Sequence, residues 1–243
     1  MIDSVNNEKI IFYKKLREKK YILENNMFIV EGAHLVEEAY KSGRLLEVIM
    51  DNTCNIIYDV KTTLVSKKCI KKISLLKSVP NIMGVVKLVK NENIIGNKIV
   101  LLDNVQDPGN VGTIIRSALA FNVSTIVMSP ESVNIYNDKL IRSTEGTIFN
   151  MNIVVMPLSE AIEKIHEMGI KVYYADMYGS INLDDADIKD YALVLGSEGK
   201  GISKLTKDKC DVMIKIPMKG KVNSLNASVA GGILMYEIMK QRI

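Results

Sequence analysis

The sequence predicts an α/β protein with a parallel sheet in its C-terminal part and a smaller α/β domain in its N-terminal part. Short, continuous apolar runs recur from residue 98 onward, as expected for strands that are buried on both faces. Helical patterns lie between most of these runs. A polar, glycine-containing stretch, residues 90–97, separates them from the first ninety residues, so we expect domains at residues 1–95 and 96–243.

The N-terminal part alternates helical and strand patterns and shows no catalytic constellation. We expect a basic helix over residues 9–20, a strand over 28–32, a helix over 33–41 and a strand over 45–50. Further strand candidates are residues 55–58, 64–66 and 83–89. The basic charges of residues 9–20 are explained as well by a solvated helix face as by contacts with RNA phosphates. A second basic group consists of Lys67, Lys68, Lys71 and Lys72.

In the C-terminal part the alternation of strand and helix becomes regular. We expect strands at residues 99–102, 125–128, 153–155, 171–174, 192–195 and 212–216. The clearest helical pattern covers residues 158–168, and Gly169 follows it where a left-handed residue commonly ends a helix.

The composition is typical of a soluble cytoplasmic protein. The chain has 243 residues, of which 47% are hydrophobic, and its formal net charge of +4 permits nucleic-acid binding without requiring it. Cys54, Cys69 and Cys210 form no Cys-x-x-Cys pair, so we expect free thiols and neither a disulfide framework nor a metal site. We find no signal peptide and no apolar run of membrane-spanning length, so we expect no membrane partner.

Unusual residues gather in three loops that follow predicted strands, where parallel sheets bind their ligands. The first loop covers residues 103–112. Asn110 is expected to cap the helix that follows, and Gly112 suggests that another group comes close to the backbone there. Arg116 lies six residues past Asn110, so the two could address one site; a plain cap and a surface arginine are the alternative.

The second loop, residues 195–203, is rich in glycine but is not a phosphate-binding loop. A Walker A loop ends in Gly-Lys-Ser/Thr and has a glycine five residues earlier, whereas here Lys200 precedes Gly201 and Val194 stands at the earlier position. What remains is a strand that ends in Gly196, followed by a carboxylate, Glu198, in a glycine-rich turn.

The third loop follows the last predicted strand, which Pro217 stops. We expect Asn223 and Ser224 to cap a helix that begins near Leu225. Gly231 and Gly232 lie inside that helix at a cost of about 1 kcal/mol each relative to alanine, which indicates that another segment passes close by. Ala227, Ala230 and Gly231 would form a flat face, and a second stripe is expected to be core: Leu225, Val229, Ile233 and Tyr236.

Together, the three loops resemble the three motifs of the SpoU/TrmH family of RNA ribose 2′-O-methyltransferases over roughly residues 101–236. Residues 136–146 resemble the family's connecting helix. Residues 28–38 resemble the substrate-binding domain of many members, a small α/β fold like that of certain RNA-binding ribosomal proteins. Asn122 replaces a usual glycine but tolerates the left-handed conformation. The residues that carry the resemblance are Asn110, Arg116, Gly196, Glu198, Ile216, Pro217, Met218, Ser224, Leu225 and Asn226.

The resemblance implies a catalytic domain with a deep trefoil knot, a homodimer whose active sites are completed across the interface, and no metal. It also implies that S-adenosyl-L-methionine (S-adenosylmethionine) binds at Gly196, Ile216, Met218 and Leu225. The catalytic residues implied are Arg116, Asn110, Glu198, Ser224 and Asn226. Because a guanidinium stays protonated, we favour Arg116 as a bidentate contact to phosphate over Arg116 as a base.

The implied reaction is methylation of a ribose 2′-hydroxyl in structured RNA. Both ribosomal and transfer RNA are substrates within the family, and we favour ribosomal RNA. Two other functions remain open: a knotted methyltransferase that modifies a base, and a non-catalytic RNA-binding protein that keeps the scaffold. Fold alone does not separate these readings, and the polar residues in the three loops favour the ribose reaction.

Overall fold

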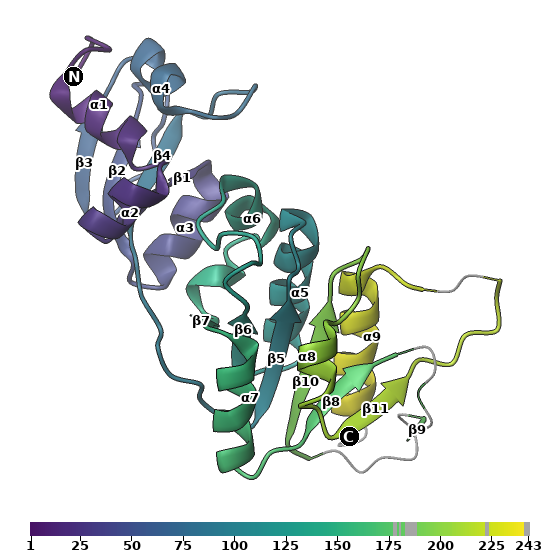
Figure 1. Cartoon of the computed structure of the whole chain (residues 1–243). Helices are drawn as coiled ribbons and strands as arrows, with labels where there is room; N and C mark the ends of the chain where they lie inside the picture. Colours follow the sequence, from purple (N-terminus) through teal and green to yellow (C-terminus); the bar gives the residue numbers. More distant parts are fainter. Residues whose placement is uncertain (177–178, 180, 183–188, 222–223, 241–243) are drawn as a thin grey trace. The chain divides into compact units, whose positions relative to one another are not determined.

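The computed structural model describes the chain except for residues 177–178, 180, 183–188, 222–223 and 241–243 (Figure 1). The chain divides into two compact units, Met1–Lys90 and Asn91–Ile243. In the described part of the chain, no helix is both long and apolar enough to cross a membrane.

The first unit is built on a four-stranded sheet in the order β1-β4-β2-β3. β4 pairs antiparallel with β1 and β2, whereas β2 and β3 are parallel. The elements are α1 (Glu8–Lys15), α2 (Lys19–Asn25), β1 (Met27–Glu31), α3 (Ala33–Lys41), β2 (Leu45–Met50), β3 (Lys61–Leu64), α4 (Lys67–Ile73) and β4 (Ile82–Lys87).

Most expected elements of this unit are present, with three differences. Residues 33–41 and 45–50 form the predicted helix and strand. The basic segment over residues 9–20 is two helices rather than one. Residues 55–58 are not a strand, and Ile57 in this loop is 90% exposed. The third strand occupies Lys61–Leu64, earlier than the predicted residues 64–66.

Arg17, one of the basic residues of the first segment, serves the interior of its unit. Its Nη2 lies 2.7 Å from Glu31 Oε1, and the two side chains are 9% and 0% exposed. Glu31 also accepts hydrogen bonds from Ser74 Oγ (2.5 Å) and from the backbone N–H of Leu75 (3.0 Å). Arg17 is therefore part of a buried ion pair and not of a surface for phosphates.

The second unit contains a seven-stranded sheet in the order β7-β6-β5-β10-β8-β11-β9, and all its paired strands are parallel. The strands are β5 (Lys98–Asp103), β6 (Thr125–Met128), β7 (Asn152–Val155), β8 (Val172–Ala175), β9 (Ile181–Asn182), β10 (Tyr191–Gly196) and β11 (Val212–Lys215). The helices are α5 (Pro108–Ala120), α6 (Asp138–Ser143), the 3-10 helix η1 (Thr147–Phe149), α7 (Leu158–Glu167), α8 (Lys204–Lys207) and α9 (Ala227–Lys240). The unit is thus the predicted α/β fold with a parallel sheet.

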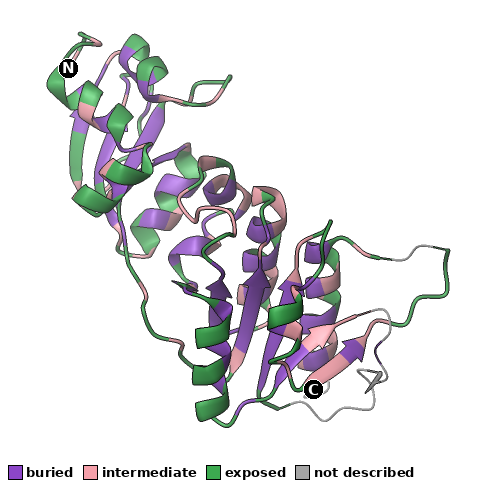
Figure 2. Cartoon of the chain, viewed as in Figure 1, coloured by how far each residue is buried: buried purple, intermediate pink, exposed green. Residues whose placement is uncertain are grey.

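Helices cover both faces of this sheet. α7 packs on one face together with Ile99, Leu101 and Val194. α9 approaches the other face, because a Cβ atom on Gly231 would lie 2.6 Å from Leu195 Cδ1, and neighbouring strand residues point to opposite faces. The central strands are accordingly drawn as buried in Figure 2.

The buried face of α9 differs from the expected one. Gly231 makes the predicted close approach, whereas a Cβ on Gly232 would have only Ser117 Oγ near it, at 3.8 Å. Val229, Ile233 and Tyr236 were expected to be core but are 50%, 38% and 46% exposed. The residues of α9 that pack inward are Ala227, Ser228, Gly231, Leu234, Met235 and Ile238.

Two helices begin at different residues from those expected. α5 begins at Pro108, and Asp107 is its cap because its side chain accepts the backbone N–H of Asn110 at 2.9 Å. Asn110 therefore lies in the first turn and is not the cap. In α9 the Oδ1 of Asn226 accepts the N–H groups of Ser228 (2.8 Å) and Val229 (3.3 Å), so Asn226 caps the helix in place of Ser224. Asn223 lies outside the described residues.

Left-handed residues and close approaches appear where the sequence suggested them. Asn122 and Gly169 have φ angles of 57° and 74° after the ends of α5 and α7. A Cβ on Gly112 would lie 2.9 Å from the backbone carbonyl carbon of Ser143, so α5 can approach α6 only because this residue is glycine.

Candidate functional site

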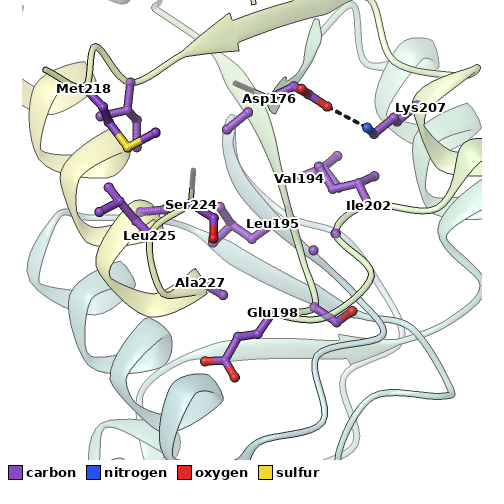
Figure 3. A pocket seen from close by; sticks show the side chains of 16 residues that line it. Asp176, Val194, Leu195, Glu198, Ile202, Lys207, Met218, Ser224, Leu225 and Ala227 are labelled. Atoms are coloured by element: carbon purple, nitrogen blue, oxygen red, sulfur yellow. Dashed lines mark hydrogen bonds and ion pairs between the residues drawn. The ribbon is translucent and has the colours of Figure 1, made fainter. Parts of the chain in front are cut away.

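A pocket lies at the carboxyl ends of β8, β10 and β11, between these strands and the start of α9 (Figure 3). The four predicted cofactor-binding residues, Gly196, Ile216, Met218 and Leu225, all line it, as do Glu198 and Ser224. The segments that follow β8, β10 and β11 therefore meet at one cavity, as expected for the ends of neighbouring parallel strands, whereas the first predicted loop, residues 103–112, contributes no lining residue.

Much of the pocket wall is apolar, and a tight turn after β10 shapes it. Val194, Leu195 and Ile202 contribute side chains to the wall. The backbone groups of Ser197 and Gly201 bond to each other in both directions, at 3.2 and 2.8 Å. A side chain on Gly196 would run into the backbone of Gly201, so this turn can fold back on the end of β10 only over a glycine.

A polar cluster joins the three loops through side-chain hydrogen bonds. The Oε1 of Glu198 accepts hydrogen bonds from Asn226 Nδ2, at 2.6 Å, and from Asn110 Nδ2. Asn226 Nδ2 also lies 2.9 Å from Asn110 Oδ1. We call Asn110, Glu198 and Asn226 the amide–carboxylate cluster. Its three members hold one another's orientation, and Glu198 brings the cluster to the pocket wall.

Ser228 supports this cluster and was not predicted from the sequence. Its Oγ donates to Asn226 Oδ1 at 2.6 Å and lies 3.3 Å from Asn110 Oδ1, and the residue is only 8% exposed. The only local signal in the sequence is that Ser228, a hydroxyl residue, stands two positions after Asn226 at the start of a helix. That arrangement is common at caps without any functional role.

Arg116 lies apart from the cluster. Its side chain is exposed, it does not line the pocket, and it has no hydrogen bond or ion pair with another described residue. Six residues of α-helix turn the side-chain direction by about 240°, so Arg116 points away from the face of α5 that presents Asn110. Of the predicted site residues, Arg116 is the one that the structure does not bring to the site of its own chain.

Two acidic residues near the pocket were also missed by the sequence analysis. Asp103, at the end of β5, is 3% exposed, and its Oδ2 accepts the backbone N–H of Ser203 at 2.8 Å. It ties β5 to the segment that follows the tight turn. Asp176, directly after β8, pairs with Lys207 at 2.6 Å, and both line the pocket. Among the described residues, no group of three His, Cys, Asp or Glu side chains is placed to hold a metal ion.

Family models cover most of the chain. The SpoU rRNA Methylase family matches residues 97–236, which include all the predicted site residues. The MRM3-like substrate binding domain matches residues 7–84.

Relatives match this chain along nearly its whole length. The 23S rRNA (guanosine(2553)-2′-O)-methyltransferase RlmP of Bacillus subtilis (strain 168) is 31% identical over 243 residues, with 98% of each chain covered. A solved structure of a putative RNA methyltransferase of the TrmH family from Porphyromonas gingivalis superposes with a TM-score of 0.88 at 29% identity, covering 98% of this chain and 99% of that one. An AdoMet-bound rRNA methyltransferase from Sinorhizobium meliloti shares the fold, with a TM-score of 0.85 at 23% identity over 100% of this chain and 98% of that one. The three converging loops, the family match over residues 97–236 and the full-length relative together establish that this chain belongs to the SpoU rRNA Methylase family.

Proposed function

We propose that the chain transfers the methyl group of S-adenosylmethionine to a ribose 2′-hydroxyl of structured RNA, with ribosomal RNA as its substrate class. The observation that carries this proposal is the amide–carboxylate cluster beside a largely apolar pocket. Glu198 belongs to both: it lines the pocket and accepts a hydrogen bond from Asn226. The name of RlmP, a 23S rRNA 2′-O-methyltransferase that matches the whole chain, supports ribosomal over transfer RNA.

The pocket fits the cofactor by its chemistry. The apolar side chains of Ile216, Met218 and Leu225 suit a flat adenine, and the strand ends around Gly196 offer backbone groups for its polar edges. Glu198 places a negative charge on the wall, which favours a positively charged sulfonium beside it. When bound, S-adenosylmethionine supplies a methyl group that is already activated on sulfur.

The residues of the chain then have to position the ribose and help its hydroxyl to lose a proton. Asn110 and Asn226 are held by Glu198 and Ser228, so their amide groups are fixed before RNA arrives. Ser224 presents a hydroxyl on the same pocket. The guanidinium of Arg116 clamps the neighbouring phosphate with two hydrogen bonds, while that phosphate or a water takes the proton of the 2′-hydroxyl.

The active form in this proposal is a homodimer in which Arg116 serves the site of a second copy. Val229, Ile233 and Tyr236 form an exposed apolar stripe on α9, which is the kind of surface that a partner covers. Tyr236 packs against Phe121 just beyond α5, with ring centroids 5.8 Å apart, and α5 also carries Arg116. A two-fold interface over this stripe would give each Arg116 access to the other chain's cluster.

Mixing two variants that are each strongly impaired tests this arrangement. In a mixed dimer of Arg116→Ala and Asn226→Ala chains, a shared site would combine the intact Arg116 of one chain with the intact Asn226 of the other. Random exchange should then restore about a quarter of the wild-type methyl transfer, because half of the dimers are mixed and each has one intact site. If Arg116 acts within its own chain, no mixed dimer has an intact site and the activity stays at background.

Three further features belong to the same proposal. The C-terminal part forms a trefoil knot, which the placement of β10 between β5 and β8 and the close approach of Gly231 to Leu195 support. Residues 1–95 bind the RNA substrate on a fold like that of certain ribosomal proteins, which the match over residues 7–84 supports. The protein acts in the cytoplasm, in keeping with free thiols at Cys54, Cys69 and Cys210.

The proposed function is tested by incubating the purified chain with S-adenosylmethionine and in-vitro transcribed ribosomal RNA. Mass spectrometry of the digested RNA should find one new 2′-O-methyl nucleotide. A methyl group on a base would favour the base-modifying reading instead. A well-folded protein that binds no S-adenosylmethionine in calorimetry would favour the non-catalytic scaffold.

A further inference from the structure

An ion pair lies in the pocket wall, apart from the amide–carboxylate cluster. Lys207 Nζ, on α8, lies 2.6 Å from Oδ2 of Asp176, the residue after β8, and the two side chains are 34% and 18% exposed. Both side chains line the cavity (Figure 3). Apolar side chains such as those of Val194 and Ile202 line the same cavity, so the ion pair is a charged feature of a largely apolar wall.

The sheet holds both partners of this pair in place. The backbone N–H of Asp176 donates to the carbonyl oxygen of Ile214 on β11 at 3.0 Å. The ammonium group of Lys207 lies 5.7 Å from the centroid of the Tyr174 ring on β8. The carboxylate of Asp176 is therefore presented at a fixed position before any ligand binds.

The pocket has three sides of different chemistry. In Figure 3, Met218 and Leu225 lie on one side, Asp176 and Lys207 on another, and Glu198 on a third. The cofactor of the proposed function also has three different parts: a flat base, a ribose with two hydroxyls, and a sulfonium that carries an amino-acid chain. The base suits the apolar side and the sulfonium suits Glu198, which leaves the ribose for the ion pair.

We infer that Asp176 accepts hydrogen bonds from the 2′- and 3′-hydroxyls of the cofactor's ribose and that Lys207 positions its carboxylate, an inference that rests on the proposed function. A carboxylate offers about four acceptor positions, enough for one lysine and two hydroxyls. A neutral diol adds donors without displacing Lys207, whereas the ammonium group of an amino acid would compete with Lys207 for Asp176. In dinucleotide-binding sheets, a carboxylate likewise binds the ribose 2′-hydroxyl.

Calorimetry with three ligands tests the inference on the full chain. The ligands are S-adenosylhomocysteine, 5′-methylthioadenosine, which lacks the amino-acid chain, and 2′-deoxy-5′-methylthioadenosine. Wild-type protein should bind 5′-methylthioadenosine roughly tenfold more tightly than its 2′-deoxy analogue, because one charge-assisted hydrogen bond is lost. This comparison requires no substitution, so it does not depend on whether a variant folds.

Substitutions then assign the effect to the ion pair. Asp176→Asn should weaken S-adenosylhomocysteine and 5′-methylthioadenosine by a similar factor, roughly tenfold, and should weaken the 2′-deoxy analogue much less. Lys207→Met should reduce the preference for ribose over 2′-deoxyribose, which a purely structural role would not change. The matched controls are Asp208→Asn and Lys204→Met. Lys204 is exposed at the start of α8 and Asp208 is exposed just after its end, so both variants should bind all three ligands as the wild type does.

Two outcomes would overturn the inference. If Asp176→Asn weakens S-adenosylhomocysteine but not 5′-methylthioadenosine, the ion pair binds the amino-acid end. If the wild type binds 5′-methylthioadenosine and its 2′-deoxy analogue equally, the 2′-hydroxyl has no partner of consequence and the proposed paired contact with Asp176 is absent. A folded wild-type protein that binds none of the three ligands would instead contradict the proposed function itself.

Discussion

Asn226 uses the two ends of one amide for two different purposes, and substitutions can separate them. Its Oδ1 accepts the backbone N–H groups of Ser228 and Val229 and so caps α9. Its Nδ2 donates to Glu198 at 2.6 Å and to Asn110 at 2.9 Å. The helix cap should therefore depend on the oxygen of this side chain, and methyl transfer on its nitrogen.

The sizes of the two effects follow from these bonds. Asn226→Ala removes the cap, which costs about 1 kcal/mol of unfolding free energy and should lower the Tm by about 2–4 °C. Asn226→Ser keeps a capping oxygen, so its Tm should lie about 2–4 °C above that of Asn226→Ala, because both variants lose the bond to Glu198 equally. Both variants lose the hydrogen bond to the Glu198 carboxylate, worth about 1.5–3 kcal/mol, and should transfer methyl groups roughly 10–100-fold more slowly.

Asn226→Asp gives a third, pH-dependent outcome. The aspartate keeps the cap oxygen but places a second carboxylate beside Glu198, at the position where Asn226 Nδ2 now donates. Two carboxylates this close cannot both ionise easily, so one of their pKa values rises. With one proton bound, the two carboxyl groups can share a hydrogen bond. With both ionised, they repel each other. The residual activity of this variant should therefore fall as the pH rises, relative to the wild type.

Scanning calorimetry and single-turnover methyl transfer measure the two effects on the same samples. Asn150→Ala is a suitable control, because Asn150 is exposed after η1 and should change neither quantity. The reasoning is refuted if Asn226→Ser loses as much stability as Asn226→Ala, or if Asn226→Ser transfers methyl groups at the wild-type rate.

Three further predictions concern other parts of the chain. Arg116→Lys should lose most of the methyl-transfer rate with little change in S-adenosylhomocysteine affinity, because lysine cannot form two parallel hydrogen bonds; near-normal single-turnover rates, or a new basic limb in the pH profile, would contradict the phosphate clamp. Deleting residues 1–90 should leave cofactor binding nearly intact and make RNA binding both weaker and less dependent on salt; an unchanged salt slope would show that the lysines of this unit are only solvated. Arg17→Met should destabilise the first unit by about 3–5 kcal/mol in urea unfolding, because Glu31 is left buried without its cation, and Arg17→Met with Glu31→Leu should be less damaging than the single substitution.

The strands of the second unit were predictable because each is a continuous apolar run. β6 begins and ends where its run does, and β5 and β10 extend theirs by one residue at each end. Such runs arise because both faces of the sheet are covered, by α7 on one side and α9 on the other. The same argument failed for residues 55–58, where two isoleucines suggested a strand. Ile57 is 90% exposed there, so an apolar pair alone does not make a strand.

Helix starts were harder to predict because several residues near each could have served as the cap. For α5 the better signal was present, since Asp107 precedes Pro108 and proline is favoured at the first helical position. For α9 the choice of Asn226 over Ser224 depends on Glu198, which lies 28 residues away in sequence. No local pattern contains that information.

The site was predictable as far as strand ends determine it. Parallel strands end at one edge of a sheet, so the segments that follow them lie close together. This is why Asn110, Glu198 and Asn226 meet in one cluster, although up to 116 residues separate them in sequence. The rule says nothing about helix faces, and Arg116 lies on a different face of α5 from Asn110, so its place at a shared site stays a prediction. The rule also gave no reason to select Asp176, whose partner Lys207 lies on α8, 31 residues away in sequence.

The strand order affects how the protein is made. β10 lies between β5 and β8, so the inner edge of β5 has no neighbour until residues 191–196 have been synthesised. From Asp103 to Gly196 the ribosome adds 93 residues (196 − 103), which takes on the order of 5 to 20 s. During that interval an apolar strand edge of the nascent chain is open to pairing with other chains, a known risk for aggregation. The strand that closes this edge also ends in Gly196, so it supplies one wall of the pocket at the same time; Ile216, Met218 and Leu225, which the ribosome adds later, complete the cavity.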